Sequence, residues 1–456
     1  MKKLKEECGI FAGFCFDTNI NKISRDGLLK LQHRGEQSCG LSVGNKDQIL
    51  IKSKGLVSDV LTDLNISKLN GHFALSHVRY STCKGNNEID SQPILVKYQN
   101  ESVSIAHNGH IKESFEIRND MEKSGETFIT STDTEVILKK IIQEIKLPPS
   151  KWTVEKIATC LNKYFSLGAW VISIFLPERI LAFRDPYGYR PLMFANTKQG
   201  FFIASEDVAF QNLDIINLIE IKAGECIEIT KEGFNIKRFA KEVENEKKCI
   251  FEHIYFANTA SSIFGRNVYE SRLALGRLSA IENPAYDSSD IIIPVMDSGL
   301  ISAIGYSQTS QIPLQIGLLK NNLICRTFIE TKIKREKKVK EKYIPIKSVI
   351  KDKNIILIDD SLVRGTTAKE LIKMLKKNLA NRIDIIITSP KLINSCSWGV
   401  DIKTKDELIA YKLKTEYEIA KYLNADSIRF LSLEGLKKIF SDTGYCYHCF
   451  MENQEN

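Results

Sequence analysis

The stretch Asn354–Thr367, which reads NIILIDDSLVRGTT, decides the fold of the second half of the chain. Its β-branched apolar run predicts a buried strand, and two adjacent carboxylates stand at the end of that strand. Gly365 then leads into an amphipathic pattern over Ala368–Lys377, so we expect a helix whose first backbone amides could hold a phosphate. An ordinary capped helix would explain the Gly and Thr residues alone, but not the whole string.

The residues of this loop are suited to a phosphorylated sugar. Adjacent carboxylates can accept the two hydroxyl groups of a ribose, and the small residues that follow can surround its 5-phosphate. The expected ligands are Asp359, Asp360, Ser361, Arg364, Gly365, Thr366 and Thr367.

A second unit of the same kind lies upstream. Ile291–Val295 predicts a strand and Leu300–Gln308 a helix, and two such units indicate a parallel, doubly wound sheet. The loop between them, PVMDSG at Pro294–Gly299, could bind a pyrophosphate with Mg²⁺, although on its own a capped turn explains it equally well. The expected pyrophosphate ligands are Asp297, Ser298 and Gly299, and the expected magnesium ligands are Ser298, Asp359 and Asp360.

The first half of the chain has a different pattern. Short apolar runs broken by Gly, Asn and Asp predict antiparallel strands, with helices at Asp26–Gln32 and Thr134–Glu144. We therefore expect an α+β domain followed by an α/β domain, with a boundary at the charged segment Ala240–Lys248. The expected strands are Ile49–Ser53, His72–Val78, Val103–His107, Ala169–Leu176, Ile180–Arg184, Gly200–Ala204 and Cys226–Thr230.

Composition excludes several classes of protein. The 456 residues are 43% hydrophobic and 26% charged, as in an ordinary globular chain of two domains. No apolar run could cross a membrane, and Met1–Glu7 is too short and charged for a signal peptide, so we expect a cytoplasmic protein. Of the net charge of +8, +5 comes from Lys332–Lys342, which argues against a nucleic-acid surface.

Cys8 lies close to the N-terminus in the string EECGIF. Taken alone, it would most simply be a buried core residue. Removal of Met1–Glu7 would give it a free α-amine, whose ordinary pKa of about 7.7–8.0 suits a general base for its own thiol. The position is therefore compatible with an N-terminal nucleophile hydrolase.

Other residues have the chemistry that a glutamine amide requires. The string HNG at His107–Gly109 could supply an oxyanion site from the Asn108 side chain and the Gly109 amide. Arg79 and Asp133 have the charges needed for the α-carboxylate and α-ammonium groups of the substrate. Each could separately be a surface pair or a turn.

Taken with further strings, the chain resembles the amidophosphoribosyltransferase family over essentially its whole length. The resemblance implies a propeptide at residues 1–7, an N-terminal nucleophile hydrolase αββα sandwich at residues 8–240, and a type I phosphoribosyltransferase domain with a parallel sheet at residues 241–456. The further strings are QHRG at Gln32–Gly35, RDPYGYRPL at Arg184–Leu192, ASED at Ala204–Asp207, FEHIYFA at Phe251–Ala257, NVYESR at Asn267–Arg272 and SIRFLSLEG at Ser427–Gly435.

The resemblance also implies an activity. Cys8 would attack glutamine bound by Arg34, Arg79 and Asp133, and the ammonia released would react with phosphoribosyl pyrophosphate to give 5-phosphoribosylamine, glutamate and pyrophosphate. This is the first committed step of purine synthesis. The implied partners are purine nucleotide inhibitors of the AMP and GMP type and further copies of the chain in a dimer or tetramer, with no nucleic acid or membrane.

The chain has 11 cysteines, and four of them form a further candidate site. Spacing alone would favour zinc or plain core residues for these four. The resemblance, to the iron–sulfur branch of the family, implies a structural [4Fe–4S] cluster instead. The four residues are Cys249, Cys396, Cys446 and Cys449. We expect Cys15, Cys39, Cys83, Cys160 and Cys226 to be buried small hydrophobic residues.

The chain departs from the family pattern in places. Glu36 and Asn322 stand where Gln and Arg are usual, and Thr327–Lys342 lacks the usual Pro-Ser-Gln stretch of a loop that orders over phosphoribosyl pyrophosphate in the family. A non-catalytic sensor of this ligand is therefore an alternative. Glucosamine-6-phosphate synthase and asparagine synthetase share the first half, but they lack the string IDDSLVRGTT.

Overall fold

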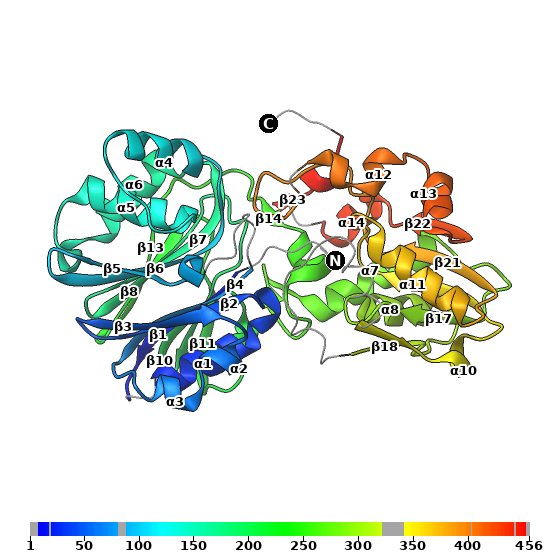
Figure 1. Ribbon diagram of the computed structural model, residues 1–456, viewed down its shortest axis with the longest axis horizontal. Helices are drawn as coiled ribbons and strands as arrows, with labels where there is room; N and C mark the ends of the chain where they lie inside the picture. The colour runs from blue at the N-terminus through cyan, green and yellow to red at the C-terminus, as the bar shows by residue number, and fades with distance from the viewer. Residues whose placement is uncertain are drawn as a thin grey trace.

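The computed structural model describes residues 8–17, 20–80, 88–321, 342–402, 404–441 and 444–452. The chain forms two halves that lie side by side, and the last strand of the first half is β13 (Gly233–Arg238) (Figure 1). Among the described residues, no helix is both long and apolar enough to cross a bilayer.

Two antiparallel sheets stack face to face in the first half (Figure 1). The first sheet consists, in spatial order, of β11 (Ile215–Glu220), β9 (Met193–Thr197), β10 (Gly200–Ala204), β1 (Gly9–Cys15), β4 (Phe73–Arg79), β2 (Ser38–Gly44) and β3 (Gln48–Lys54). The second consists of β13, β12 (Glu225–Thr230), β8 (Arg179–Arg184), β7 (Gly168–Leu176), β6 (Glu101–Ile111) and β5 (Ile94–Tyr98).

Helices cover the outer face of each sheet, which gives the αββα sandwich that the resemblance implies. Strand β1 illustrates the layering, because its side chains alternate between the two faces. Ile10 and Phe14 lie in the core between the sheets, whereas Phe11 packs in the core beneath the first helix layer. That layer is α1 (Ile20–Lys30), α2 (Val57–Val60) and α3 (Asp63–Ile66), and the layer on the second sheet is α4 (Ser114–Lys123), α5 (Asp133–Ile145) and α6 (Val154–Tyr164).

The second half is built on a parallel sheet of four strands. Their order is β17 (Ile291–Pro294), β20 (Asn354–Asp359), β21 (Arg382–Ile387) and β22 (Ser427–Phe430). Ile356 and Ile358 pack on one face with α7 (Val268–Glu282) and α8 (Leu300–Ser310). Ile355 and Leu357 pack on the other face with α11 (Thr366–Lys377), α13 (Glu416–Leu423) and the hairpin of β18 (Leu318–Lys320) and β19 (Tyr343–Pro345).

A further apolar core joins the C-terminal tail to the first residues of the second half. β14 (Lys248–Cys249) pairs in parallel with β23 (Tyr445–Cys446), and the turn of π-helix η5 (Glu252–Phe256) begins three residues after β14 ends. Phe251 of this region stacks on Phe450 of the tail, with ring centroids 5.4 Å apart. The described part of the tail around Tyr445 and Phe450 is therefore held against the first residues of the second half.

The predicted elements match the structure closely. The strand predicted at Asn354–Ile358 is β20, and the helix predicted at Ala368–Lys377 is α11, which begins at Thr366. The helix predicted at Asp26–Gln32 is the later part of α1, which begins at Ile20. Cys15, Cys39, Cys160 and Cys226 are buried as expected, and Cys83 lies outside the described residues.

Candidate active sites

The first site is a cavity of about 510 Å³ at the ends of strands from both sheets of the sandwich. Cys8 immediately precedes β1, Arg79 ends β4, and Asp133 begins α5. The cavity brings together five of the residues that the sequence predicts for glutamine chemistry: Cys8, Arg79, Asn108, Gly109 and Asp133.

Asn108 and Gly109, near the end of β6, form a potential oxyanion site. The Asn108 side chain is 1% exposed, and its Nδ2 has no hydrogen-bond partner in the described part of the chain. A buried donor of this kind is unfavourable unless a ligand supplies an acceptor. Gly109 has φ of +135°, and a Cβ there would lie 1.9 Å from the carbonyl oxygen of Ala169, so only glycine fits.

Two opposite charges flank this donor. Asp133 accepts a hydrogen bond from the backbone N–H of Ile111 at 3.3 Å, and its Oδ1 lies 3.4 Å from Nδ1 of His107. Burial alone would raise the pKa of Asp133, but His107 and the Ile111 amide lower it to about 2, so the carboxylate is ionised. Arg79 donates from Nη1 to the carbonyl oxygen of Asp90 at 2.6 Å, which fixes its guanidinium at the cavity.

Arg34 is the third residue that the resemblance implies for glutamine binding. It does not line the cavity, and its Nε donates to the carbonyl oxygen of Cys8 at 3.1 Å. Its Nη1 and Nη2 lie 2.6 Å and 3.1 Å from Glu206 and Glu252, respectively. The guanidinium is thus saturated by protein groups and holds the main chain of Cys8, which is a geometric reason against direct contact with glutamine.

Part of the cavity wall comes from the second half of the chain, which sequence reasoning missed. Gly399, at φ of +99°, lies so close that a Cβ would be 3.2 Å from the Cβ of His110. The preceding residue, Trp398, stacks on Tyr189 with ring centroids 5.0 Å apart. The segment is irregular, so no periodicity marks it. Its residues in the cavity wall are Cys396, Gly399, Val400 and Asp401.

The second site lies at the carboxyl end of the parallel sheet, where β20 ends. The two predicted loops meet there, because Ser298 Oγ donates to Asp359 Oδ1 at 3.2 Å and Gly299 approaches the carbonyl oxygen of Ile358 too closely for a Cβ. Gly365, at φ of +71°, turns the chain into α11, and no side chain caps that helix. The first amides of α11 therefore face the loop that the sequence predicts for a phosphate. The residues around the hollow are Tyr255, Asp359, Ser361, Leu362, Val363, Arg364, Gly365, Thr366, Thr367 and Ala368.

Charged residues at this site are engaged with protein partners. Arg364 forms an ion pair with Glu407, and Asp297 forms one with Lys320. Asp360 accepts a hydrogen bond from Ser361 Oγ at 2.6 Å and is buried. The divergent segment at Thr327–Lys342 lies almost wholly outside the described residues, as does Asn322.

The four predicted cluster cysteines are neighbours in space. Cys249 and Cys446 are paired in the β14–β23 ladder. A hydrogen bond from Cys449 and the backbone amides of Val400 and Trp398 lower the pKa of Cys396 to about 7, whereas burial raises the pKa of Cys446 to about 11. Within the described residues, no group of three or more His, Cys, Asp and Glu side chains is arranged to hold a single metal ion.

Comparisons with known proteins agree with this geometry. A family model described as a glutamine amidotransferase domain matches residues 77–212. The amidophosphoribosyltransferase of Methanocaldococcus jannaschii is 37% identical, over 97% of this chain and 96% of the relative. That of Bacillus subtilis is 34% identical, over 99% and 94%. The solved structure of the B. subtilis glutamine phosphoribosylpyrophosphate amidotransferase, complexed with ADP and GMP, covers 97% of this chain and 96% of its own, with a TM-score of 0.87 and 32% identity.

A hydrolase sandwich and a parallel phosphoribosyltransferase sheet thus occur in one chain that matches these relatives almost from end to end. The chain belongs to the amidophosphoribosyltransferase family, whose enzymes catalyse the first committed step of purine biosynthesis.

Proposed function

We propose that the two cavities are the glutaminase and phosphoribosyltransferase sites of this reaction, with residues 8–240 and 241–456 as the two domains. The observation that carries the proposal is the first cavity, where the Cys8 thiol, the unpartnered Nδ2 of Asn108 and the opposite charges of Arg79 and Asp133 meet. These are the groups that hydrolysis of a glutamine amide requires.

In the glutaminase site, Cys8 is the nucleophile. After loss of residues 1–7, its α-amine takes the thiol proton, and the sulfur adds to the carboxamide carbon of glutamine. The Asn108 side chain and the Gly109 amide donate to the oxyanion that forms. The carbon–nitrogen bond then breaks, the α-ammonium returns a proton to the departing ammonia, and water hydrolyses the remaining thioester to glutamate.

Arg79 and Asp133 hold the other end of the substrate. The Arg79 guanidinium pairs with the α-carboxylate of glutamine, and the ionised Asp133 pairs with its α-ammonium. Arg34 acts on the nucleophile instead of on the substrate, because its Nε donates to the carbonyl oxygen of Cys8. It is therefore proposed as a positioning residue and not as a ligand of glutamine.

In the phosphoribosyltransferase site, ammonia attacks the anomeric carbon of phosphoribosyl pyrophosphate. The bond to pyrophosphate breaks, pyrophosphate leaves with the bonding electrons, and the nitrogen loses a proton. Asp359 and Asp360 bind the ribose hydroxyls, Ser361 and the Arg364–Thr367 turn bind the 5-phosphate, and Asp297–Gly299 bind the pyrophosphate. The contact between Ser298 and Asp359 gathers oxygen donors of the kind that Mg²⁺ prefers. Mg²⁺, held by Ser298, Asp359 and Asp360, would neutralise charge on the pyrophosphate.

A [4Fe–4S] cluster, if bound by Cys249, Cys396, Cys446 and Cys449, would have a structural role. The fit rests on four thiols from dispersed positions that lie close enough to influence one another's ionisation. Burial opposes the ionisation of Cys249, so a positively charged group at this place would stabilise its thiolate. A cluster there would join the tail to the wall of the glutamine cavity, since Cys396 belongs to both.

The proposal also covers regulation and assembly. Because the B. subtilis structure is complexed with ADP and GMP, we propose purine nucleotides as inhibitors of this chain. A homodimer or homotetramer in the cytoplasm, where thiols stay reduced, completes the proposal.

The test is a steady-state assay of the purified protein with glutamine, phosphoribosyl pyrophosphate and Mg²⁺. Glutamate, pyrophosphate and phosphoribosylamine should appear in equal amounts. Glutamate release with no pyrophosphate under any condition would contradict the second site, and binding without turnover of either substrate would identify a sensor instead.

A further inference from the structure

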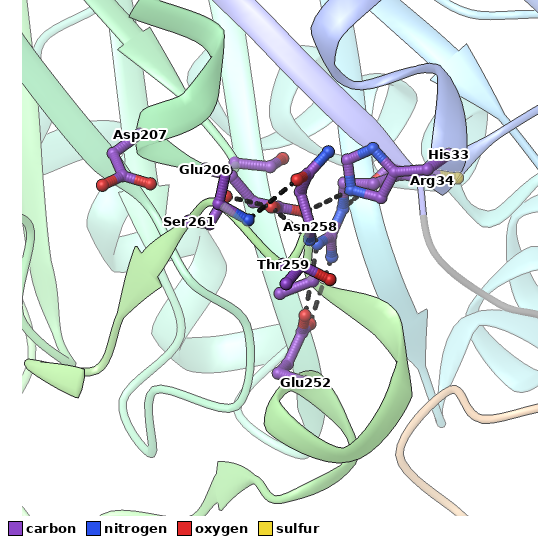
Figure 2. A network of polar contacts seen from close by, with 12 residues as sticks. His33, Arg34, Glu206, Asp207, Glu252, Asn258, Thr259 and Ser261 are labelled. Atoms are coloured by element: carbon purple, nitrogen blue, oxygen red, sulfur yellow. Dashed lines mark hydrogen bonds and ion pairs between the residues drawn. The ribbon is translucent and has the colours of Figure 1, made fainter. Parts of the chain in front are cut away.

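Next to Cys8, each half of the chain contributes a buried carboxylate that contacts the other half. Figure 2 shows Arg34 between Glu206, which belongs to the first half, and Glu252, which belongs to the second. The side chains of all three residues are 0% exposed. Because all three charges are buried, removal of one of them leaves its partner without full charge compensation.

The first-half carboxylate reaches into the second half. One oxygen of Glu206 accepts from Arg34 at 2.6 Å and contacts His33 at 2.8 Å. The other accepts from the Asn258 amide at 2.8 Å and from Ser261 Oγ at 2.5 Å. Burial alone would raise the pKa of Glu206, but His33, Arg34 and the Ser261 hydroxyl outweigh it and hold this pKa well below its usual range, so the carboxylate is ionised.

The second-half carboxylate reaches into the first half, where it contacts Arg34 and the cavity-lining residue Arg190. Glu252 accepts from Arg34 Nη2 at 3.1 Å and Nη1 at 3.2 Å, a two-pronged contact that fixes the plane of the guanidinium. It also accepts from Arg190 Nη1 at 3.4 Å. Arg190 lines the cavity and donates from Nη2 to the carbonyl oxygen of Trp398 at 3.3 Å.

Glu252 is thus linked to two parts of the glutamine site, the main chain of Cys8 and the wall segment from the second half. Through Arg34 it fixes the carbonyl oxygen of Cys8, and through Arg190 it fixes the segment that carries Gly399 to Asp401. Its own position is set by the π-helical turn η5, whose backbone is tied to α7 because Arg272 donates to the carbonyl oxygens of His253 and Ala257 at 2.9 Å and 2.8 Å. A turn of this type is rare and often occurs at a functional site.

We propose that Glu252, although it belongs to the phosphoribosyltransferase half, is a positioning residue for the glutaminase nucleophile. The inference rests on the proposed role of Cys8. Loss of the Glu252 charge removes one of the two carboxylates that hold the Arg34 guanidinium, so Arg34 shifts toward Glu206, and the Cys8 main chain, with the α-amine that serves as base, then moves relative to the oxyanion donors. The glutaminase site is in this sense incomplete without the second half of the chain.

The test compares Glu252→Gln with a matched carboxylate that joins the halves elsewhere. Glu220 pairs with the buried Arg184 at 3.1 Å and accepts from the Gly265 amide at 3.1 Å, but it has no contact with Cys8. For Glu252→Gln, kcat with glutamine should fall about 10- to 100-fold, as for a misplacement of about 1 Å. The KM for glutamine should change less than about threefold, because Arg79 and Asp133 remain, whereas Glu220→Gln should leave both constants unchanged.

Two further measurements separate positioning from folding. Ammonia-dependent synthesis by Glu252→Gln should stay within about twofold of wild type. Alkylation of Cys8 in this variant by a diazoketone analogue of glutamine should slow by the same factor as kcat with glutamine. Glu252→Asp keeps the charge in a shorter side chain and should lose less. Unchanged kcat with glutamine, or an equal loss with ammonia, would overturn the proposal. A Cys8→Ala variant run in parallel shows whether the proposed nucleophile itself has failed.

Discussion

Replacement of Asn108 by Ala tests the oxyanion site, and the structure predicts effects of different size on activity and on stability. Loss of one preorganised donor reduces kcat about 10²- to 10³-fold, or about 3–4 kcal/mol of transition-state stabilisation. Nδ2 has no partner among the described residues, so no hydrogen bond of the folded protein is lost with it. Removal of an unsatisfied buried donor relieves a penalty of about 1–3 kcal/mol, which offsets the lost packing of the amide.

The assay is glutamine hydrolysis at saturating substrate, together with a thermal melt of the same preparation. We expect the large loss in kcat, a small change in KM, and a melting temperature within about 3 °C of wild type. Asn108→Asp is the matched control, because it keeps the shape but places an acceptor beside the oxyanion, and it should be at least as slow. A loss of less than about fivefold in Asn108→Ala, or a large fall in melting temperature, would refute the assignment of Asn108 as an oxyanion donor.

Three other predictions concern maturation, metal and the sugar site. Intact-mass measurement of active enzyme should give a chain that starts at Cys8, and full activity in a chain that retains Met1–Glu7 would rule out the free α-amine as base. Protein purified without oxygen should be brown with about four iron atoms per chain, whereas stoichiometric zinc without iron would disprove the cluster. Asp359→Asn and Asp360→Asn should abolish synthesis with either nitrogen source but leave glutamine hydrolysis measurable, and unchanged affinity for phosphoribosyl pyrophosphate in both variants would exclude the proposed ribose contacts.

Two strands of the parallel sheet, β17 and β20, could be predicted from local pattern, because they are buried on both faces. Asn354–Ile358 is apolar at every position after the first, and the structure places Ile355 and Ile356 in cores on opposite faces of the sheet. Strands β1, β2, β5, β9, β11 and β13 were not predicted, but the other seven antiparallel strands of the first half were visible from their apolar runs and turns. Their stacking into an αββα sandwich was not, since pairings such as Phe11 with Ala204 join residues that no local pattern connects. That part of the prediction came from the resemblance.

Some residues of the candidate site could be predicted from the sequence and others could not. Cys8, Arg79, Asn108 and Asp133 stand at element ends with chemistry that a motif reveals. Arg34 had the right charge for glutamine, but sequence cannot show that two buried carboxylates from distant segments surround it. The wall at residues 399–401 was missed because it comes from an irregular segment whose position depends on Trp398 and Arg190.

The central claim is that ammonia released from glutamine at one site is used at a second, separate site. The most direct test is to measure product formation by Cys8→Ala with glutamine and with ammonia as nitrogen sources. The nucleophile serves only to release ammonia from glutamine, so synthesis with glutamine should fall by several orders of magnitude. With high ammonium at alkaline pH, the same variant should form phosphoribosylamine at close to the wild-type rate, because Asp359–Thr367 and Asp297–Gly299 are untouched. Near-normal activity of Cys8→Ala with glutamine would contradict the account.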